Sequence, residues 1–155
     1  MSELQKEILQ SRPFSSREEE VFLNLQRTAY ALRLKVDEIL KSHGLTGTQY
    51  NVLRILRGAG GDGLPCSEIG ERMVTNDSDI TRLLERLEKA GLITKQRAQE
   101  DRRVIVTRIT DEGLKLLDDL DEPITETNVE NLGHLGPEML EQLNALLVLA
   151  RRSGK

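Results

Sequence analysis

A cluster of hydrogen-bonding and basic side chains occupies the start of one amphipathic segment, residues 76–93, with the sequence NDSDITRLLERLEKAGLI. Polar residues fall on its first turns, and apolar residues follow at the i, i+3, i+4, i+7 spacing of a buried helix face. Asn76 and Asp79 have the spacing of a capping pair, and Gly91 is a typical helix stop. A helix that buries one face and offers Ser, Thr and Arg at its N-terminal end suits the major groove of DNA. The chemistry that this segment predicts is hydrogen bonding to bases and phosphates of a duplex.

Composition predicts a helical protein of one domain. The chain has 155 residues, of which 31% are charged and 3% aromatic, and it contains no Trp. The net charge is −4, yet residues 45–110 carry eleven basic and nine acidic side chains, whereas residues 111–155 carry four basic and ten acidic ones. Affinity for DNA would therefore depend on a few well-placed arginines, because the chain has no broad basic surface.

Several other classes of protein are not supported by the sequence. No apolar run has the length of a membrane span, and the N-terminus lacks the apolar core of a signal peptide, so we expect a cytoplasmic protein without a membrane partner. The single cysteine, Cys66, is interpreted as a structural thiol, since one cysteine cannot form an intrachain disulfide. His43 and His134 stand alone, so no metal or other cofactor is predicted. We recognise no glycine-rich phosphate loop between strand and helix and no nucleophile constellation, and we expect no enzyme.

The elements around the DNA-facing segment predict a helix-turn-helix. An apolar stripe from Ser16 to about His43 predicts one long helix, and Thr46 with Gln49 forms a capping box that opens a shorter one. A glycine-rich loop at 58–63, broken by Pro65, separates it from a short helix over 67–73. That helix and the segment at 76–93 are joined by a tight turn, as in a helix-turn-helix.

A β-hairpin is predicted directly after this pair of helices. Residues 92–97 and 103–110 alternate and are rich in β-branched side chains, and residues 98–102 form the loop of a wing. Thr110 then caps a further helix, which Pro123 kinks or restarts, and a last helix follows Gly136-Pro137.

The predicted fold class is mainly α with a small β-hairpin. We expect a single domain over 1–155, in which 45–110 form a winged helix-turn-helix lobe for DNA binding, and 1–44 with 111–155 form a helical dimerisation lobe built from both termini. The terminal segments carry apolar stripes that the central lobe leaves uncovered, and the economical solution is a C2 dimer. The residues predicted for dimerisation are Phe14, Val21, Leu25, Leu140, Leu143 and Leu147.

Three motifs in this order resemble the MarR family of bacterial transcriptional regulators. Residues 45–53 resemble the family's entry into the lobe, residues 81–93 its recognition helix and exit, and residues 100–113 its wing and return strand. The resemblance implies a homodimer on a pseudo-palindromic operator of double-stranded DNA, with wing arginines in the flanking minor grooves and often a small-molecule effector pocket. The chain departs from the family at Asp77, Ser78 and Asp79, where members often have Pro followed by Ser-Thr. These two acids place the operator preference in question.

The candidate site follows from these motifs. Arg86 would contact phosphate or brace the wing through Asp101, and Arg103 matches the family's wing position. Lys95 and Arg97 are interpreted as generic phosphate contacts or solvated edge charges. The residues predicted for DNA binding are Ser67, Asn76, Ser78, Asp79, Thr81, Arg82, Arg86, Lys95, Arg97, Asp101, Arg102 and Arg103. The effector pocket, if present, is placed near Tyr30, Leu34 and Tyr50.

Two functional hypotheses follow from the sequence. The first is a homodimeric transcription factor, a repressor released by a small-molecule effector. The second is a dimeric adaptor whose winged helix binds protein without DNA. The acidic net charge favours the adaptor, whereas Arg82, Arg102 and Arg103 favour the DNA-binding regulator.

Overall fold

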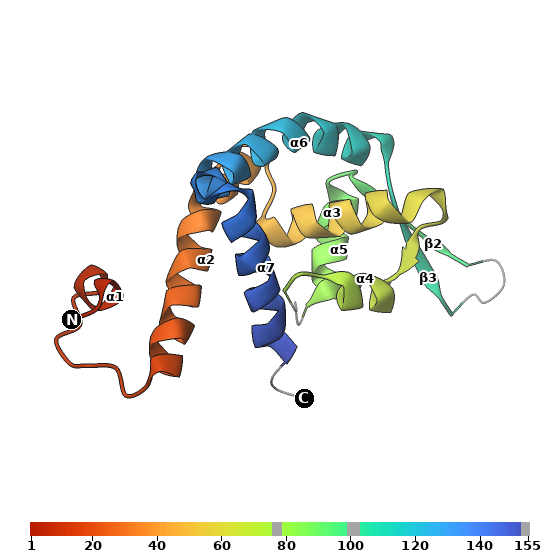
Figure 1. The fold of residues 1–155 in the computed structure, drawn as a ribbon. Helices are drawn as coiled ribbons and strands as arrows, with labels where there is room; N and C mark the ends of the chain where they lie inside the picture. Colours follow the sequence, from red (N-terminus) through yellow and green to blue (C-terminus); the bar gives the residue numbers. More distant parts are fainter. Residues whose placement is uncertain (76–78, 99–102, 153–155) are drawn as a thin grey trace. The chain divides into compact units, whose positions relative to one another are not determined.

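The computed structural model describes residues 1–75, 79–98 and 103–152 of the chain. These residues form a mainly helical protein with one small antiparallel sheet, which confirms the predicted fold class (Figure 1). The chain divides into two compact units, Met1–Val36 and Asp37–Lys155. The predicted division into lobes at residues 44 and 111 stays a prediction. Within the described ranges, no helix has the length and apolarity that crossing a membrane requires.

The first unit contains α1 (Glu3–Glu7) and most of α2 (Arg17–Ser42). The predicted long helix is confirmed by α2, and the Ser16 hydroxyl accepts the Glu19 backbone N–H at 3.1 Å just before it. Helix α1 was not expected, because five residues are too few for a periodic pattern. It is opened by a capping box between Ser2 and Gln5.

The second unit begins with the end of α2 and is built around α3 (Gly47–Ala59), which opens at the predicted capping box of Thr46 and Gln49. The short turn η1 (Gly60–Asp62) follows, then α4 (Cys66–Arg72) and α5 (Ile80–Lys89). These helices share an aliphatic core. Its members with no more than 2% exposure include Val52, Leu53, Leu56, Ile69, Leu84 and Leu87.

The sheet has three strands in the order β1-β3-β2. The predicted hairpin is confirmed by β2 (Ile93–Arg97) and β3 (Ile105–Ile109), which pair antiparallel and project away from the helices of this unit (Figure 1). Strand β1 (Leu64–Pro65) was not expected, because its two residues lie between the predicted loop at 58–63 and the predicted helix over 67–73. Gly63 leads into it at φ +71°, and a Cβ there would lie 2.4 Å from the Thr107 carbonyl oxygen, so glycine is required at this close approach.

Three elements complete the second unit: α6 (Asp111–Leu132), η2 (Gly133–Leu135) and α7 (Gly136–Arg152). Thr110 caps α6 as predicted, since its hydroxyl accepts the Gly113 N–H at 3.1 Å. The alternative in which Pro123 restarts a helix is wrong, because α6 runs through Pro123 without interruption. Leu117, Leu120 and Ile124 are buried on both sides of the proline, and this packing offsets the hydrogen bond that it lacks.

Candidate nucleic-acid interface

The N-terminal end of α5 is capped by Asp79. The helix begins at Ile80, and the Asp79 carboxylate accepts the Arg82 backbone N–H at 3.3 Å. The sequence had suggested Asn76 as the cap, with the helix starting three residues earlier. A short carboxylate next to free N–H groups is a good cap, and it also suits the positive end of the helix dipole. The same carboxylate lies 3.9 Å from Nη1 of Arg82.

Helix α5 has a buried face and a polar face, as its sequence predicts. Leu83, Leu84 and Leu87 are buried against the rest of the unit. Thr81, Arg82 and Arg86 are exposed, and the Arg82 side chain retains 69% of its accessible surface. Helix α5 therefore presents two arginines and a hydroxyl from a backbone whose other side is fixed in the core.

The turn that enters α5 is held by a contact that the sequence analysis missed. The side-chain oxygen Oδ1 of Asn51, on α3, accepts the backbone N–H of Val74 at 2.8 Å. The two residues are 23 positions apart. Asn51 lies inside the motif that resembles the family's entry into the lobe, but a motif does not reveal which distant N–H its side chain reaches.

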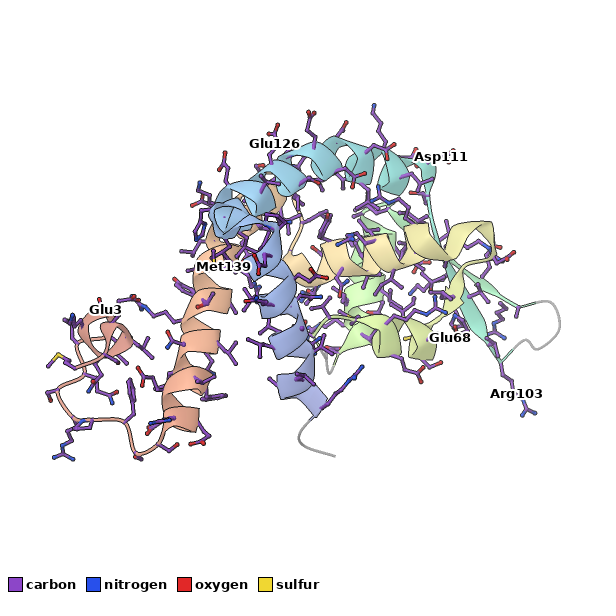
Figure 2. All side chains as sticks on the ribbon, in the orientation of Figure 1. Glu3, Glu68, Arg103, Asp111, Glu126 and Met139 are labelled. Carbon is purple, nitrogen blue, oxygen red and sulfur yellow. The ribbon has the colours of Figure 1, made fainter. Side chains whose placement is uncertain are left out.

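The wing contributes charged side chains of two kinds. Lys95 is engaged within the protein, because its Nζ lies 2.8 Å from Glu88 on α5 and the side chain is only 22% exposed. Arg97 and Arg103 are exposed, and Figure 2 shows Arg103 pointing away from the ribbon beside the hairpin loop. Arg108, which the sequence analysis did not single out, donates from Nε to the Gly61 carbonyl oxygen at 2.9 Å and holds β3 against η1. Lys95 and Arg108 thus fix the wing, while Arg97 and Arg103 extend from it.

Part of the predicted site falls outside the described residues. These positions are Asn76, Ser78, Asp101 and Arg102. The proposed brace between Arg86 and Asp101 therefore stays a prediction. Ser67 is exposed as the second residue of α4, where its hydroxyl is accessible to a partner.

A bidentate ion pair joins α3 to α6. Arg57 on α3 donates from both terminal nitrogens to the two carboxylate oxygens of Asp121, at 2.8 Å each. Asp118 lies 3.6 Å from the same guanidinium. The hydrogen bonds from Arg57 hold the pKa of the Asp121 carboxyl below its usual range, and those to Asp121 raise the pKa of Arg57.

The residues predicted for dimerisation lie at the surface of a single chain. Val21 is 57% exposed, Leu25 39% and Leu143 37%. Phe14, Leu140 and Leu147 are half-buried. No residue of α7 is buried within its described span, and Leu40 is the one buried residue in the described length of α2. Each of these helices therefore carries an apolar surface that the single chain leaves open to water.

A hollow of about 400 Å³ lies in the first unit, between α1 and α2. Two of the three predicted pocket residues, Tyr30 and Leu34, line it together with Arg27, whose Nε lies 2.7 Å from Glu7. Tyr50 is not among the lining residues, since it lies on α3, where its ring is 5.8 Å from the Arg54 guanidinium. Partial burial raises the pKa of the Tyr50 hydroxyl.

His43 and Cys66 both lie at helix ends. His43 follows α2, and its Nδ1 lies 2.9 Å from the Ile39 carbonyl oxygen near the helix C-terminus. Cys66 is a half-buried free thiol at the start of α4. Over the described part of the chain, no group of three His, Cys, Asp or Glu side chains is arranged to hold a metal ion.

Comparison with known proteins agrees with this geometry. The model of the MarR family matches residues 43–104, which span α3, the helix-turn-helix and the wing up to Val104. The uncharacterized HTH-type transcriptional regulator YfiV of Bacillus subtilis (strain 168) is 30% identical over 146 residues, covering 93% of this chain and 89% of YfiV.

Solved structures of the family share the fold. A MarR transcription factor from Planctomyces limnophilus is 39% identical, with a TM-score of 0.68 and coverage of 88% of this chain and 99% of that chain. The PcaV transcriptional regulator from Streptomyces coelicolor, solved with its natural ligand, is 26% identical, with a TM-score of 0.74 and coverage of 94% and 99%. These relatives agree with the exposed polar face of α5 and with the adjoining wing. The chain belongs to the MarR family of transcriptional regulators.

Proposed function

We propose that this regulator is a homodimeric repressor that binds a specific double-stranded operator and is released from it by a small-molecule effector. The observation that carries the proposal is the polar face of α5, with Thr81, Arg82 and Arg86 exposed while Leu83 and Leu87 are buried. A helix fixed in this way can enter the major groove, and a repressor then acts by occupying the site.

The apolar surfaces of α2 and α7 support the dimer. A helix of 17 residues with no buried side chain gains little from tertiary packing, which normally supplies most of the stability of a helix. Leu143, Leu146 and Leu149 of α7 are between 37% and 63% exposed. Covering them with a second copy removes this apolar area from water and gives the protein the twofold symmetry of a pseudo-palindrome.

Sedimentation tests the dimer directly. Replacing both Leu143 and Leu147 by Glu places charges on the proposed interface, and we expect the double variant to sediment as a monomer while the wild-type chain sediments as a dimer. Lys115→Glu, at an exposed position of α6, is the control and is expected to leave the mass unchanged. A dimeric double variant with native helicity would contradict the proposed interface.

DNA recognition would combine α5 with the wing. Twofold-related α5 helices would enter major grooves about one helical turn apart. Arg103, exposed beside the wing loop, would reach the flanking minor groove, whose negative potential attracts arginine. Because residues 45–110 have an excess of only two positive charges, we expect a shallower salt dependence than that of strongly basic DNA-binding proteins.

The effector would occupy the hollow beside Tyr30 and Leu34. Its volume of about 400 Å³ suits a small organic molecule, and the PcaV relative was solved with its natural ligand. A ligand that binds the DNA-free form more tightly than the DNA-bound form would release the operator by linkage.

Duplex selection and salt titration test DNA binding. A duplex selected by the wild-type chain from a random pool is measured against Arg82→Ala/Arg103→Ala and against the control Lys115→Ala/Arg152→Ala, which removes the same charge from α6 and α7. We expect the first pair to weaken binding about 100-fold, based on roughly 1–3 kcal/mol for each specific arginine contact, and the control to weaken it far less. Equal losses in the two variants would refute contact through α5 and the wing.

The adaptor hypothesis is decided by the same duplex selection. The acidic composition of residues 111–155 favours a protein partner over a polyanion. A chain that retains no duplex from the random pool at low salt would support the adaptor and exclude the DNA-binding regulator.

A further inference from the structure

We infer that Asn51 is a positioning residue for DNA recognition: it anchors the turn that leads into α5 and thereby sets where the DNA-facing end of that helix lies. The inference rests on the proposed function, because it concerns the same polar face of α5. It adds to the candidate site a residue that lies on α3 and is not part of the recognition helix α5.

Side-chain packing does little to hold the described part of the turn. Its described residues are Met73–Thr75 and Asp79, between the end of α4 at Arg72 and the start of α5 at Ile80. Val74 is 86% exposed, so its side chain gains almost nothing from packing. A turn with so few buried apolar contacts depends on its backbone hydrogen bonds for a defined position.

Asn51 supplies such a bond from a rigid part of the molecule. Its Oδ1 accepts the Val74 N–H at 2.8 Å, a short and favourable distance. Asn51 is flanked on α3 by Val52 and Leu53, both with no exposed surface, and lies two residues after the capping box closed by Gln49. The acceptor therefore extends from a helix whose next two residues are buried in the core, while the hydrogen bond itself is exposed to solvent and its donor lies on the surface turn.

The geometry makes the side chain hard to replace. Asp has the same length and retains an acceptor oxygen, whereas Leu has a similar volume but no acceptor and leaves the Val74 N–H without its partner. Loss of the bond would let the turn sample other positions, and Thr81 and Arg82 follow the turn at the start of α5. Base contacts depend on sub-ångström placement, whereas non-specific phosphate contacts tolerate displacement.

The test compares Asn51→Leu with Asn51→Asp. For each, binding is measured to the duplex selected by the wild-type chain and to an unrelated duplex of equal length, and amide hydrogen exchange is measured at Val74. In Asn51→Leu we expect exchange at Val74 to accelerate about fivefold or more, as loss of one hydrogen bond implies. We expect binding to the selected duplex to weaken about tenfold, against about twofold at most for the unrelated duplex.

The Asp variant is the rescue. Its added charge weakens binding to both duplexes alike, so the ratio of the two affinities, rather than either alone, should return to the wild-type value. A merely structural role would lower the unfolding temperature of Asn51→Leu but leave that ratio unchanged, and this result would overturn the inference.

The hydrogen-exchange arm separates this inference from the proposed function. If the wild-type chain selects no duplex, the proposed function fails and the recognition role of Asn51 fails with it, while faster exchange in Asn51→Leu would still support the anchor at Val74. Unchanged exchange at Val74 in Asn51→Leu would overturn the anchor whatever the DNA measurements show.

Discussion

Arg57 and Asp121 face each other across α3 and α6 and share two parallel hydrogen bonds of 2.8 Å each, although 64 positions separate them in the sequence. This geometry fixes both the distance and the rotation of one helix against the other, because the planar guanidinium and the planar carboxylate meet edge to edge. Helix α3 also contacts α4 and α5, the two helices of the helix-turn-helix. The pair therefore connects α6 to the helix on which α4 and α5 pack.

Removing this pair should lower stability modestly. The side chains of Arg57 and Asp121 are 31% and 48% exposed, so solvent screens much of their attraction. We expect Arg57→Ala to reduce the free energy of unfolding by about 1 kcal/mol, with a double-mutant cycle against Asp121→Ala giving a coupling of similar size. Urea denaturation measures both quantities. Additive effects of the two changes would show that the pair contributes nothing beyond its separate parts.

The pair also predicts a pH dependence. Arg57 lowers the pKa of the Asp121 carboxyl in the folded chain, while the unfolded chain retains the usual value of about 3.9. The stabilisation is therefore complete above that value and is lost as the pH falls through the lower folded pKa. The difference in unfolding free energy between the wild-type chain and Asp121→Asn should be constant from about pH 7 to 5 and shrink below about pH 4. A constant difference down to pH 2 would contradict the assignment.

Asp79→Asn should loosen discrimination between duplexes without unfolding the helix. Asparagine caps as well as aspartate, so α5 keeps its first turn, but the negative charge beside Arg82 is removed. We expect affinity for an unrelated duplex to rise about two- to fivefold at low salt, since one repulsive charge near the phosphates disappears. Fluorescence anisotropy at several salt concentrations measures this. Loss of binding to the selected duplex alone would instead identify Asp79 as a residue that accepts from a cytosine amino group.

Gly113→Ala should destabilise the fold strongly. A Cβ at this position would lie 2.5 Å from the Leu92 carbonyl oxygen, and backbone atoms cannot give way cheaply. We expect a loss of about 2–3 kcal/mol in the free energy of unfolding. Gly58→Ala is the matched control, because no described atom lies within 4 Å of its added Cβ, and a helical alanine should raise stability by about 0.5 kcal/mol. Thermal unfolding distinguishes the two, and equal effects would contradict the packing of α6 on Leu92.

Local signals predicted the long elements well. Thr46 with Gln49 and Thr110 mark the starts of α3 and α6, because a cap and the helix that it opens are neighbours in the sequence. Alternation over residues 92–97 and 103–110 gave the hairpin for the same reason. Patterns within about ten residues are sufficient where the stabilising contacts are themselves local.

Several of the missed features depend on distant partners. Strand β1 exists because Leu64 and Pro65 pair with Thr107 and Val106, and nothing in the two residues alone indicates it. The contact from Asn51 to Val74 likewise joins α3 to a turn 23 positions further along the chain. In the candidate site, the exposure of Arg82 followed from the helical period, whereas the engagement of Lys95 by Glu88 did not, since it needs the angle between β2 and α5.

The order of the strands has a consequence for solubility. Strand β3 is hydrogen-bonded to another strand along both of its edges. The sheet can therefore pair with a strand of a neighbouring chain only through β1 or β2. Strand β1 is two residues long and contains a proline, which donates no N–H, and β2 carries Lys95 and Arg97. Short length, proline and charge are the features that keep open strand edges from adding strands of another molecule. The exposed Arg97 thus also resists aggregation, and a variant that neutralises it should lose monodispersity before it loses its fold.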